Sequence, residues 1–160
     1  MPDAIIAIKQ KVNKMKLKAV RHHDFCAGHR VVGHESKCAN LHGHNYRIHF
    51  HCEAENLTLD EVGRVVDFSV IKETLCEWLE TNWDHRMLIW EQDQMLETLQ
   101  ELDPKVVVVP FNPTAENIVD HLLHVVCPAE LAITKELGYE LKVTKIDLEE
   151  TRKCSVTGEI

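Results

Sequence analysis

The stretch HGHNYRIHFHCEA, residues 42–54, alternates between two kinds of side chain. From position 45 onward, polar or charged residues hold the odd positions, and Tyr, Ile, Phe, Cys and Ala hold the even ones. Successive side chains of a β-strand point to opposite faces, so this pattern predicts a half-buried antiparallel strand. One face of that strand packs on a core, and the other faces solvent.

Further strands are predicted on both sides of this segment. Residues 16–29 alternate less cleanly, because Arg21 and His23 interrupt the apolar phase. Residues 30–40 are polar and are predicted to form a loop. Two final strands are expected at about 140–151 and 153–159. A shift of the apolar phase near residues 144–145 is typical of a β-bulge.

Two helices, each with one apolar stripe, are predicted between the strands. The first begins at Asp67 or Ser69 and continues to about residue 79. The second opens at 113–116 with Asn112 or Thr114 as cap and reaches Gly138, with Pro128 either breaking it or preceding a continuation over 129–137. A short polar helix over 91–104 and a β-branched run over 106–109 lie between them. This order predicts an α+β fold, with an antiparallel sheet and two helices on one face.

Composition points to one soluble domain covering residues 1–160. The chain is 44% hydrophobic and 28% charged, and it contains no repeat or linker that would divide it. Its formal net charge of -8 disfavours general nucleic-acid binding but allows a small phosphorylated substrate in a local basic pocket. The apolar stretch at residues 4–8 is too short for a membrane span or a signal sequence. We therefore expect a cytoplasmic protein with no membrane partner.

The numbers and spacing of cysteines and histidines bear on the oxidation state of the thiols and on metal binding. Six cysteines are widely spaced, with no CxxC pair, so reduced thiols are expected. Eleven histidines exceed ordinary usage and hint at metal chemistry.

His42-Gly43-His44 is a candidate metal-binding pair. Side chains at i and i+2 of a strand share a face, and Gly43 leaves room for two imidazoles to approach one ion. His29 ends the preceding strand in its inward phase, so pairing of the two strands would bring all three together. Three nitrogen ligands leave a fourth position open, as in catalytic zinc sites. His49 and His51 have the same spacing but lie on the polar face.

Cys38 lies four residues before His42, in the predicted loop. A thiol near a metal ion and imidazoles can act as a thiolate base or nucleophile. Two alternatives remain at this stage: a fourth ligand in a structural zinc site of one cysteine and three histidines, and an inert loop cysteine.

Two acidic motifs follow. Asp84-His85 after the first helix has the composition of a proton-transfer pair, although solvated helix-end residues would look the same. Glu150 falls in the inward phase of its strand, where an unpaired carboxylate is costly. It is expected to meet donors of a ligand or a buried Arg or Lys.

Together these motifs resemble the 6-pyruvoyl-tetrahydropterin synthase family over roughly residues 17–160. Each is weak alone, and their order and spacing carry the resemblance. The matching pieces are Phe25-Cys26-Ala27-Gly28-His29, Cys38-x3-His42-Gly43-His44-Asn45-Tyr46, Gly63-x3-Asp67-Phe68, Asp84-His85, Pro113-Thr114-Ala115-Glu116-Asn117, Glu150-Thr151 and Gly158-Glu159.

The resemblance implies the tunnelling fold, a four-stranded antiparallel sheet with two antiparallel helices on one face. Subunits of that fold form rings that pair into a homohexamer, with active sites between subunits. Residues 1–15 would be an N-terminal extension, and 91–104 an enlarged connection. Trp83 and Ile89 depart from the family pattern around Asp84-His85.

The resemblance also implies roles for the candidate residues. Zinc would be bound by the three histidines, and Cys38 would be the proton-abstracting thiolate. Glu150 would anchor a pterin through its 2-amino and ring N–H groups. The full implied set is His29, His42 and His44 for the metal, Cys38, Asp84 and His85 for catalysis, and Glu150, Thr114 and Glu116 for the substrate.

The three residues between Cys38 and His42 match the 6-carboxy-tetrahydropterin synthase branch, which serves queuosine and 7-deazaguanine biosynthesis. The implied reaction converts 7,8-dihydroneopterin triphosphate to 6-carboxy-tetrahydropterin, acetaldehyde and triphosphate. Arg30, Lys37 and Arg47 are candidates for holding the triphosphate. The alternatives are a pyruvoyl-forming synthase, an epimerase or aldolase on the same pterin, and a non-enzymatic zinc protein or histidine-rich metal buffer.

Overall fold

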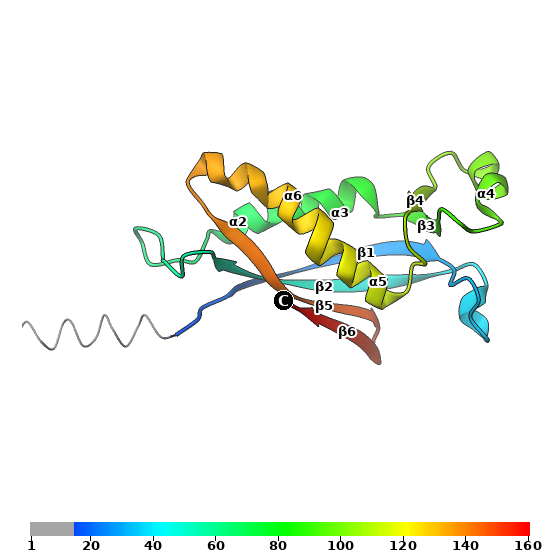
Figure 1. Ribbon diagram of the computed structural model, residues 1–160, viewed down its shortest axis with the longest axis horizontal. Coiled ribbons are helices and arrows are strands. Elements are labelled where there is room, and N and C mark those ends of the chain that lie inside the picture. The colour runs from blue at the N-terminus through cyan, green and yellow to red at the C-terminus, as the bar shows by residue number, and fades with distance from the viewer. Residues whose placement is uncertain (1–14) are drawn as a thin grey trace, which may run out of the picture.

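A computed structural model describes residues 15–160 and has a six-stranded mixed sheet at its centre (Figure 1). The strands are β1 (Ala19–His29), β2 (His42–Ala54), β3 (Arg86–Trp90), β4 (Val107–Val109), β5 (Leu141–Thr151) and β6 (Cys154–Glu159). Their order across the sheet is β4-β3-β1-β2-β5-β6. Strands β1, β2, β5 and β6 pair antiparallel, and β3 and β4 extend the sheet beyond β1 by parallel pairing.

The observed sheet therefore exceeds the four antiparallel strands that we expected. The short strand at 106–109 is present as β4, but β3 was not predicted. Its sequence, RMLIW, has no alternation, and it pairs with only three residues of β1, Ala27 to His29. Alternation of apolar and polar residues identifies a strand with one face in solvent. β3 lacks this pattern because two consecutive residues, Leu88 and Ile89, are both fully buried.

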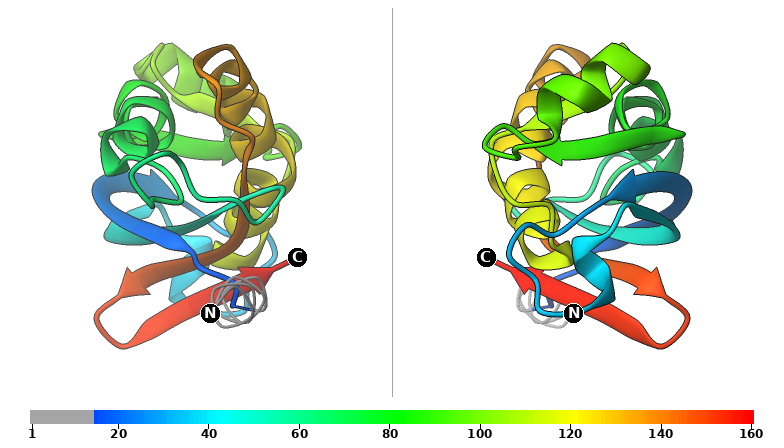
Figure 2. Two further views of the ribbon diagram at one scale, coloured as in Figure 1. Left: turned by 90° about the vertical axis from the view of Figure 1, so that its left-hand side faces the viewer. Right: turned by 90° about the vertical axis from the view of Figure 1, so that its right-hand side faces the viewer.

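Two helical segments cover one face of the sheet (Figure 2) and run in opposite directions across it (Figure 1). The first comprises α2 (Phe68–Ile71), the π-helical turn η2 (Lys72–Cys76) and α3 (Glu77–Asn82). The second comprises α5 (Ala115–His121), the π-helical turn η3 (Leu122–Val126), α6 (Cys127–Leu131) and the 3-10 helix η4 (Ala132–Leu137). The predicted α+β arrangement of two helices on one face is confirmed.

The helix ends follow the local chemistry of the sequence. Asp67 accepts a hydrogen bond from the Ser69 N–H, and Thr114 accepts one from the Asn117 N–H. Gly138 ends the second segment in the left-handed conformation, at φ 85°. Pro128 lies in the first turn of α6, directly after the π-helical turn η3, and the segment continues through it.

The alternation of residues 42–54 places the core as predicted. Tyr46, Ile48 and Phe50 are at most 1% exposed. The phase shift in β5 is a bulge: His51 pairs with Lys145 and Cys52 with Val143, so Thr144 is the extra residue. This extra residue lets both ends of β5 keep their apolar side chains on the core side.

Loops gather at the end of the sheet where β1 ends and β2 begins. The predicted loop 30–40 contains one 3-10 turn, η1 (Lys37–Ala39), and the 91–104 connection carries a shorter helix than expected, α4 (Leu96–Leu102). The start of α5 lies against the same end of the sheet, because the Asn112 side chain hydrogen-bonds Val32. None of the helices in residues 15–160 is long and apolar enough to cross a membrane.

Candidate metal centre and active site

Three imidazoles converge where β1 meets β2. The antiparallel register pairs His29 with His42 and Ala27 with His44. One ligand atom from each of His29, His42 and His44 lies within 4.8 Å of the other two. The His29 and His42 Nε2 atoms are 3.1 Å apart, close to the spacing of about 3.3 Å between ligand nitrogens of a tetrahedral zinc ion. This triad can hold a metal ion.

Neighbouring carbonyl groups orient two of these rings. The Nδ1–H of His29 donates to the Pro113 carbonyl at 2.6 Å, and that of His42 donates to the Asn40 carbonyl at 2.7 Å. Such bonds place the proton on Nδ1 and leave the Nε2 lone pair for a metal. The Nε2 atom of His44 is buried without a hydrogen-bond partner in the described part of the chain, and a bound metal ion would satisfy it.

Burial keeps the triad in the form that binds metal. It lowers the pKa of His29 and of His44 below the usual 6.5, because the charged imidazolium is poorly solvated there. The positive charge that His42 can carry lowers both pKa values further, against the opposing influence of Glu150. Metal ions bind the neutral imidazole, so proton competition weakens as these pKa values fall.

We therefore expect a metal ion bound to the triad to be retained as the pH falls through 6.5, the usual imidazole pKa, and to be released only at lower pH. Protonation, and with it release, follows the lowered pKa values of His29 and His44. Metal content after dialysis at stepwise lower pH, measured by mass spectrometry, tests this. A His49→Ala variant, altered on the polar face, should give the same curve. Release already near neutral pH would contradict the prediction.

Cys38 lies in η1 and lines a cavity beside the triad. The cavity has a volume of about 270 Å³. Four more of the predicted site residues line it with Cys38: His29, Thr114, Glu116 and Glu150. Among the residues that the structure describes, the sulfur of Cys38 is not part of the cluster that could hold a metal. The thiol is therefore placed beside the metal centre, facing a space that a substrate could fill.

Glu150 contacts both the cavity and the triad. Its Oε1 atom lies 3.7 Å from the His29 Nε2 and 3.8 Å from the His44 Nε2. The buried Arg or Lys that we considered as its partner is not observed: within residues 15–160, its only ion-pair partners are these two histidines. The carboxylate is a quarter exposed, so it can accept hydrogen bonds from a ligand in the cavity.

Tyr46 is a site residue that our sequence reading assigned only to the core. Its hydroxyl lies 3.5 Å from the His29 Nε2, and its ring stacks on Phe25. Burial, and then the neighbouring Glu150 carboxylate, raise the pKa of Tyr46, so the phenol stays protonated as a hydrogen-bond donor. Its inward phase two residues after His44 was the available signal.

Asp84 and His85 form a dyad in a different hollow. The His85 Nδ1 lies 2.6 Å from the Asp84 Oδ2, and the Cys26 N–H donates to Asp84 Oδ1 at 2.8 Å. Partial burial opposes ionisation of Asp84, but the hydrogen bonds from Cys26 and His85 outweigh it and lower its pKa. His85 has a positive φ of 56° and a side chain 78% exposed. The dyad lines a hollow of about 540 Å³ that does not include Cys38, so one chain does not bring the two together.

Trp83 and Ile89, the two residues that depart from the family pattern, lie in the core. Trp83 is 2% exposed and packs near Phe25 and Trp78, and Ile89 is fully buried. Neither side chain lines the hollow that contains the dyad.

Two of the three candidate phosphate-binding residues form ion pairs with carboxylates of the same chain. Arg30 lies 3.4 Å from the buried Asp93 and also contacts Met95. Arg47 makes two hydrogen bonds to Asp24, at 2.6 and 2.7 Å. Lys37 has no carboxylate within ion-pair distance in residues 15–160, which leaves its charge available next to Cys38.

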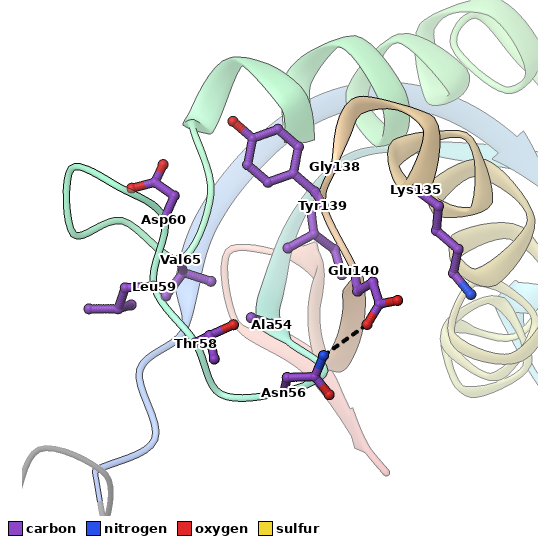
Figure 3. A pocket seen from close by; sticks show the side chains of 11 residues that line it. Ala54, Asn56, Thr58, Leu59, Asp60, Val65, Lys135, Gly138, Tyr139 and Glu140 are labelled. Atoms are coloured by element: carbon purple, nitrogen blue, oxygen red, sulfur yellow. Dashed lines mark hydrogen bonds between the residues drawn. The ribbon is translucent and has the colours of Figure 1, made fainter.

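A further cavity of about 340 Å³ lies at the opposite end of β2 (Figure 3). It is bordered by Ala54, by the loop after it and by the start of β5. Asn56 and Glu140 hydrogen-bond one another across it at 2.9 Å. Among the residues that the structure describes, no histidine or cysteine lines this cavity.

Comparisons with known proteins point to one family. The family model described as 6-pyruvoyl tetrahydropterin synthase matches residues 18–159. A 6-carboxy-5,6,7,8-tetrahydropterin synthase of Rickettsia bellii is 38% identical over 144 residues, which cover 88% of this chain and 98% of that protein. The Rickettsia felis protein of the same name is 35% identical with the same coverage.

Two solved structures share the fold. An uncharacterized protein from Wolinella succinogenes superposes with a TM-score of 0.74 at 24% identity, over 91% of this chain and 98% of that one. The Caenorhabditis elegans 6-pyruvoyl tetrahydropterin synthase gives a TM-score of 0.57 at 21% identity, over 91% and 96%. At these identities the two structures support the fold alone.

Proposed function

Because this chain belongs to the 6-pyruvoyl tetrahydropterin synthase family, we propose that it is a 6-carboxy-5,6,7,8-tetrahydropterin synthase. The substrate would be 7,8-dihydroneopterin triphosphate, and the products 6-carboxy-tetrahydropterin, acetaldehyde and triphosphate. The relatives from Rickettsia carry this name and align along nearly their whole length. The observation that carries the proposal is the histidine triad beside a cavity lined by Cys38, Thr114 and Glu150.

The metal would be zinc. Three neutral imidazole nitrogens with an open fourth position are the ligand set of catalytic zinc sites, and His29, His42 and His44 have that composition and spacing. Zinc bound there would act as a Lewis acid toward the substrate's side-chain hydroxyls. The sulfur of Cys38 lies outside the cluster, which favours this arrangement over a structural site with the cysteine as fourth ligand.

The residues that line the cavity would have separate roles in proton transfer and substrate binding. Cys38, as a thiolate, would remove a proton from the substrate side chain. Glu150 would accept hydrogen bonds from the 2-amino group and a ring N–H of the pterin, with Thr114 and Glu116 beside it. The protonated hydroxyl of Tyr46 would lie at the buried side of the site, 3.5 Å from the His29 Nε2.

The Asp84–His85 dyad would shuttle protons during tautomerisation and carbon–carbon cleavage. Asp84 orients the imidazole through Nδ1, so the Nε2 of His85 is presented to solvent. Cys38 is not in the same hollow. We therefore assign the dyad to the active site of a neighbouring subunit, within a homohexamer of the tunnelling fold whose sites lie between chains.

Lys37 would contact the triphosphate. It neighbours Cys38, and it retains an uncompensated charge where Arg30 and Arg47 are paired. The free state of all six cysteines supports a reducing, cytoplasmic location. The product would serve queuosine or another 7-deazaguanine pathway.

The direct test is incubation of the zinc-loaded protein with 7,8-dihydroneopterin triphosphate. Mass spectrometry should identify 6-carboxy-tetrahydropterin, with acetaldehyde and triphosphate in equal amounts. Removal of zinc with a chelator should abolish turnover, and its return should restore it. Formation of a pyruvoyl pterin would assign the chain to the other branch, and absence of any pterin product would contradict the proposal.

A further inference from the structure

The side chain of Asn112 joins two parts of the chain that are 80 residues apart. Its Oδ1 accepts a hydrogen bond from the Val32 N–H at 2.9 Å, and its Nδ2 donates to the Val32 carbonyl at 2.9 Å. The amide thereby satisfies both backbone groups of Val32, as a neighbouring strand would. Only a side chain with an adjacent donor and acceptor can do this.

Val32 lies in the loop over residues 30–40 that carries Cys38. The Val31 N–H donates to the Cys38 carbonyl at 2.7 Å, so the loop closes on itself one residue before the attachment point. Within it, the Asn40 N–H donates to the Lys37 carbonyl at 3.0 Å and completes the turn around Cys38. The two bonds of Asn112 connect this closed loop to the segment that precedes α5.

The backbone carbonyl groups of Asn112 and of the residue after it accept hydrogen bonds from residues of the site. The Asn112 carbonyl accepts from the Thr114 N–H at 2.8 Å and from the Asn117 side chain at 2.9 Å. The next residue, Pro113, supplies the carbonyl that accepts from His29 Nδ1–H at 2.6 Å. One short segment therefore contacts the metal triad, the substrate cavity and the Cys38 loop.

We propose that Asn112 is a positioning residue that sets where the Cys38 thiol lies relative to the metal triad and the cavity. A thiol held in a loop has no strand register to place it, so its position depends on where the loop is fastened. Misplacement of a reacting group by about 1 Å can cost about 10²-fold in rate. The role in turnover rests on the proposed function, whereas the placement of the thiol does not.

The test compares Asn112→Ala, which removes both bonds, with Asn112→Asp, which keeps the acceptor but sets an oxygen against the Val32 carbonyl. Asn56→Ala is the control, since it removes one side-chain bond, to Glu140, in the cavity at the opposite end of β2. In both Asn112 variants we expect kcat to fall about 10- to 100-fold with KM within about 3-fold. Zinc content should stay at the wild-type level.

The second readout needs no substrate. Alkylation of Cys38 by iodoacetamide, followed by peptide mass spectrometry, should be several-fold faster in both Asn112 variants than in wild type and in Asn56→Ala. This measurement separates the inference from the proposed function, because it applies even if the wild type makes a different pterin or none. Unchanged Cys38 alkylation in both variants would overturn the inference. So would loss of zinc and secondary structure in both, which would show that Asn112 serves folding instead.

Discussion

Replacement of Cys38 by alanine is expected to lower kcat for 7,8-dihydroneopterin triphosphate by about 10²- to 10⁴-fold while zinc stays bound. The thiol lines the cavity beside the triad, and its sulfur lies outside the cluster that could hold the metal. Removal of the thiolate should thus remove the proton transfer and leave all three nitrogen ligands in place. Product formation by mass spectrometry and metal content of the same samples check both parts.

A matched control is Cys76→Ala, which removes a buried thiol of η2 that does not line this cavity and should keep nearly full activity. Loss of zinc together with activity in Cys38→Ala would identify the sulfur as a structural ligand. Full activity in that variant would remove Cys38 from the mechanism.

The second large effect is expected for Glu150→Ala. Hydrogen bonds to charged groups contribute about 1.5–3 kcal/mol each, so loss of two bonds to the pterin should weaken substrate binding by about 10²- to 10⁴-fold. Zinc should be retained, because His29, His42 and His44 remain. Calorimetric titration with a pterin substrate analogue and metal analysis give the two readouts.

Asp147→Ala is the control for this experiment. Asp147 lies three residues before Glu150 in β5 and pairs with His51, at 2.7 Å, on the polar face of the sheet. The variant removes a carboxylate of the same strand that lines neither the cavity nor the hollow of the dyad, so pterin binding should not change. Release of zinc from Glu150→Ala would instead show that this carboxylate, 3.7 Å from His29, is the fourth ligand.

Local periodicity explains what could be predicted. The alternation of residues 42–54 put Tyr46, Ile48 and Phe50 in the core and His42 and His44 on one face. The caps at Asp67 and Thr114 and the bulge at Thr144 also follow from neighbouring residues. β3 has no alternation of apolar and polar residues, so it was not predicted from the sequence.

The site required more than periodicity. His29 meets His42 because β1 and β2 form a hairpin whose register pairs their last and first residues, and a predicted pair of adjacent strands anticipates that. The same register brings the Tyr46 hydroxyl close to the His29 Nε2, a contact that was not predicted from the sequence.

The sequence by itself determined which residues lie on a common face of the alternating strands, and it left two candidate caps for each long helix, Asp67 or Ser69 and Asn112 or Thr114. Those properties depend on side chains within a few positions of one another. Only the tertiary structure decided that Glu150 lies beside His29, that Asn112 fastens the Cys38 loop, and that the Asp84–His85 dyad lies in a separate hollow. These contacts join segments far apart in the chain, and they depend on how the helices and strands pack, which no local pattern encodes.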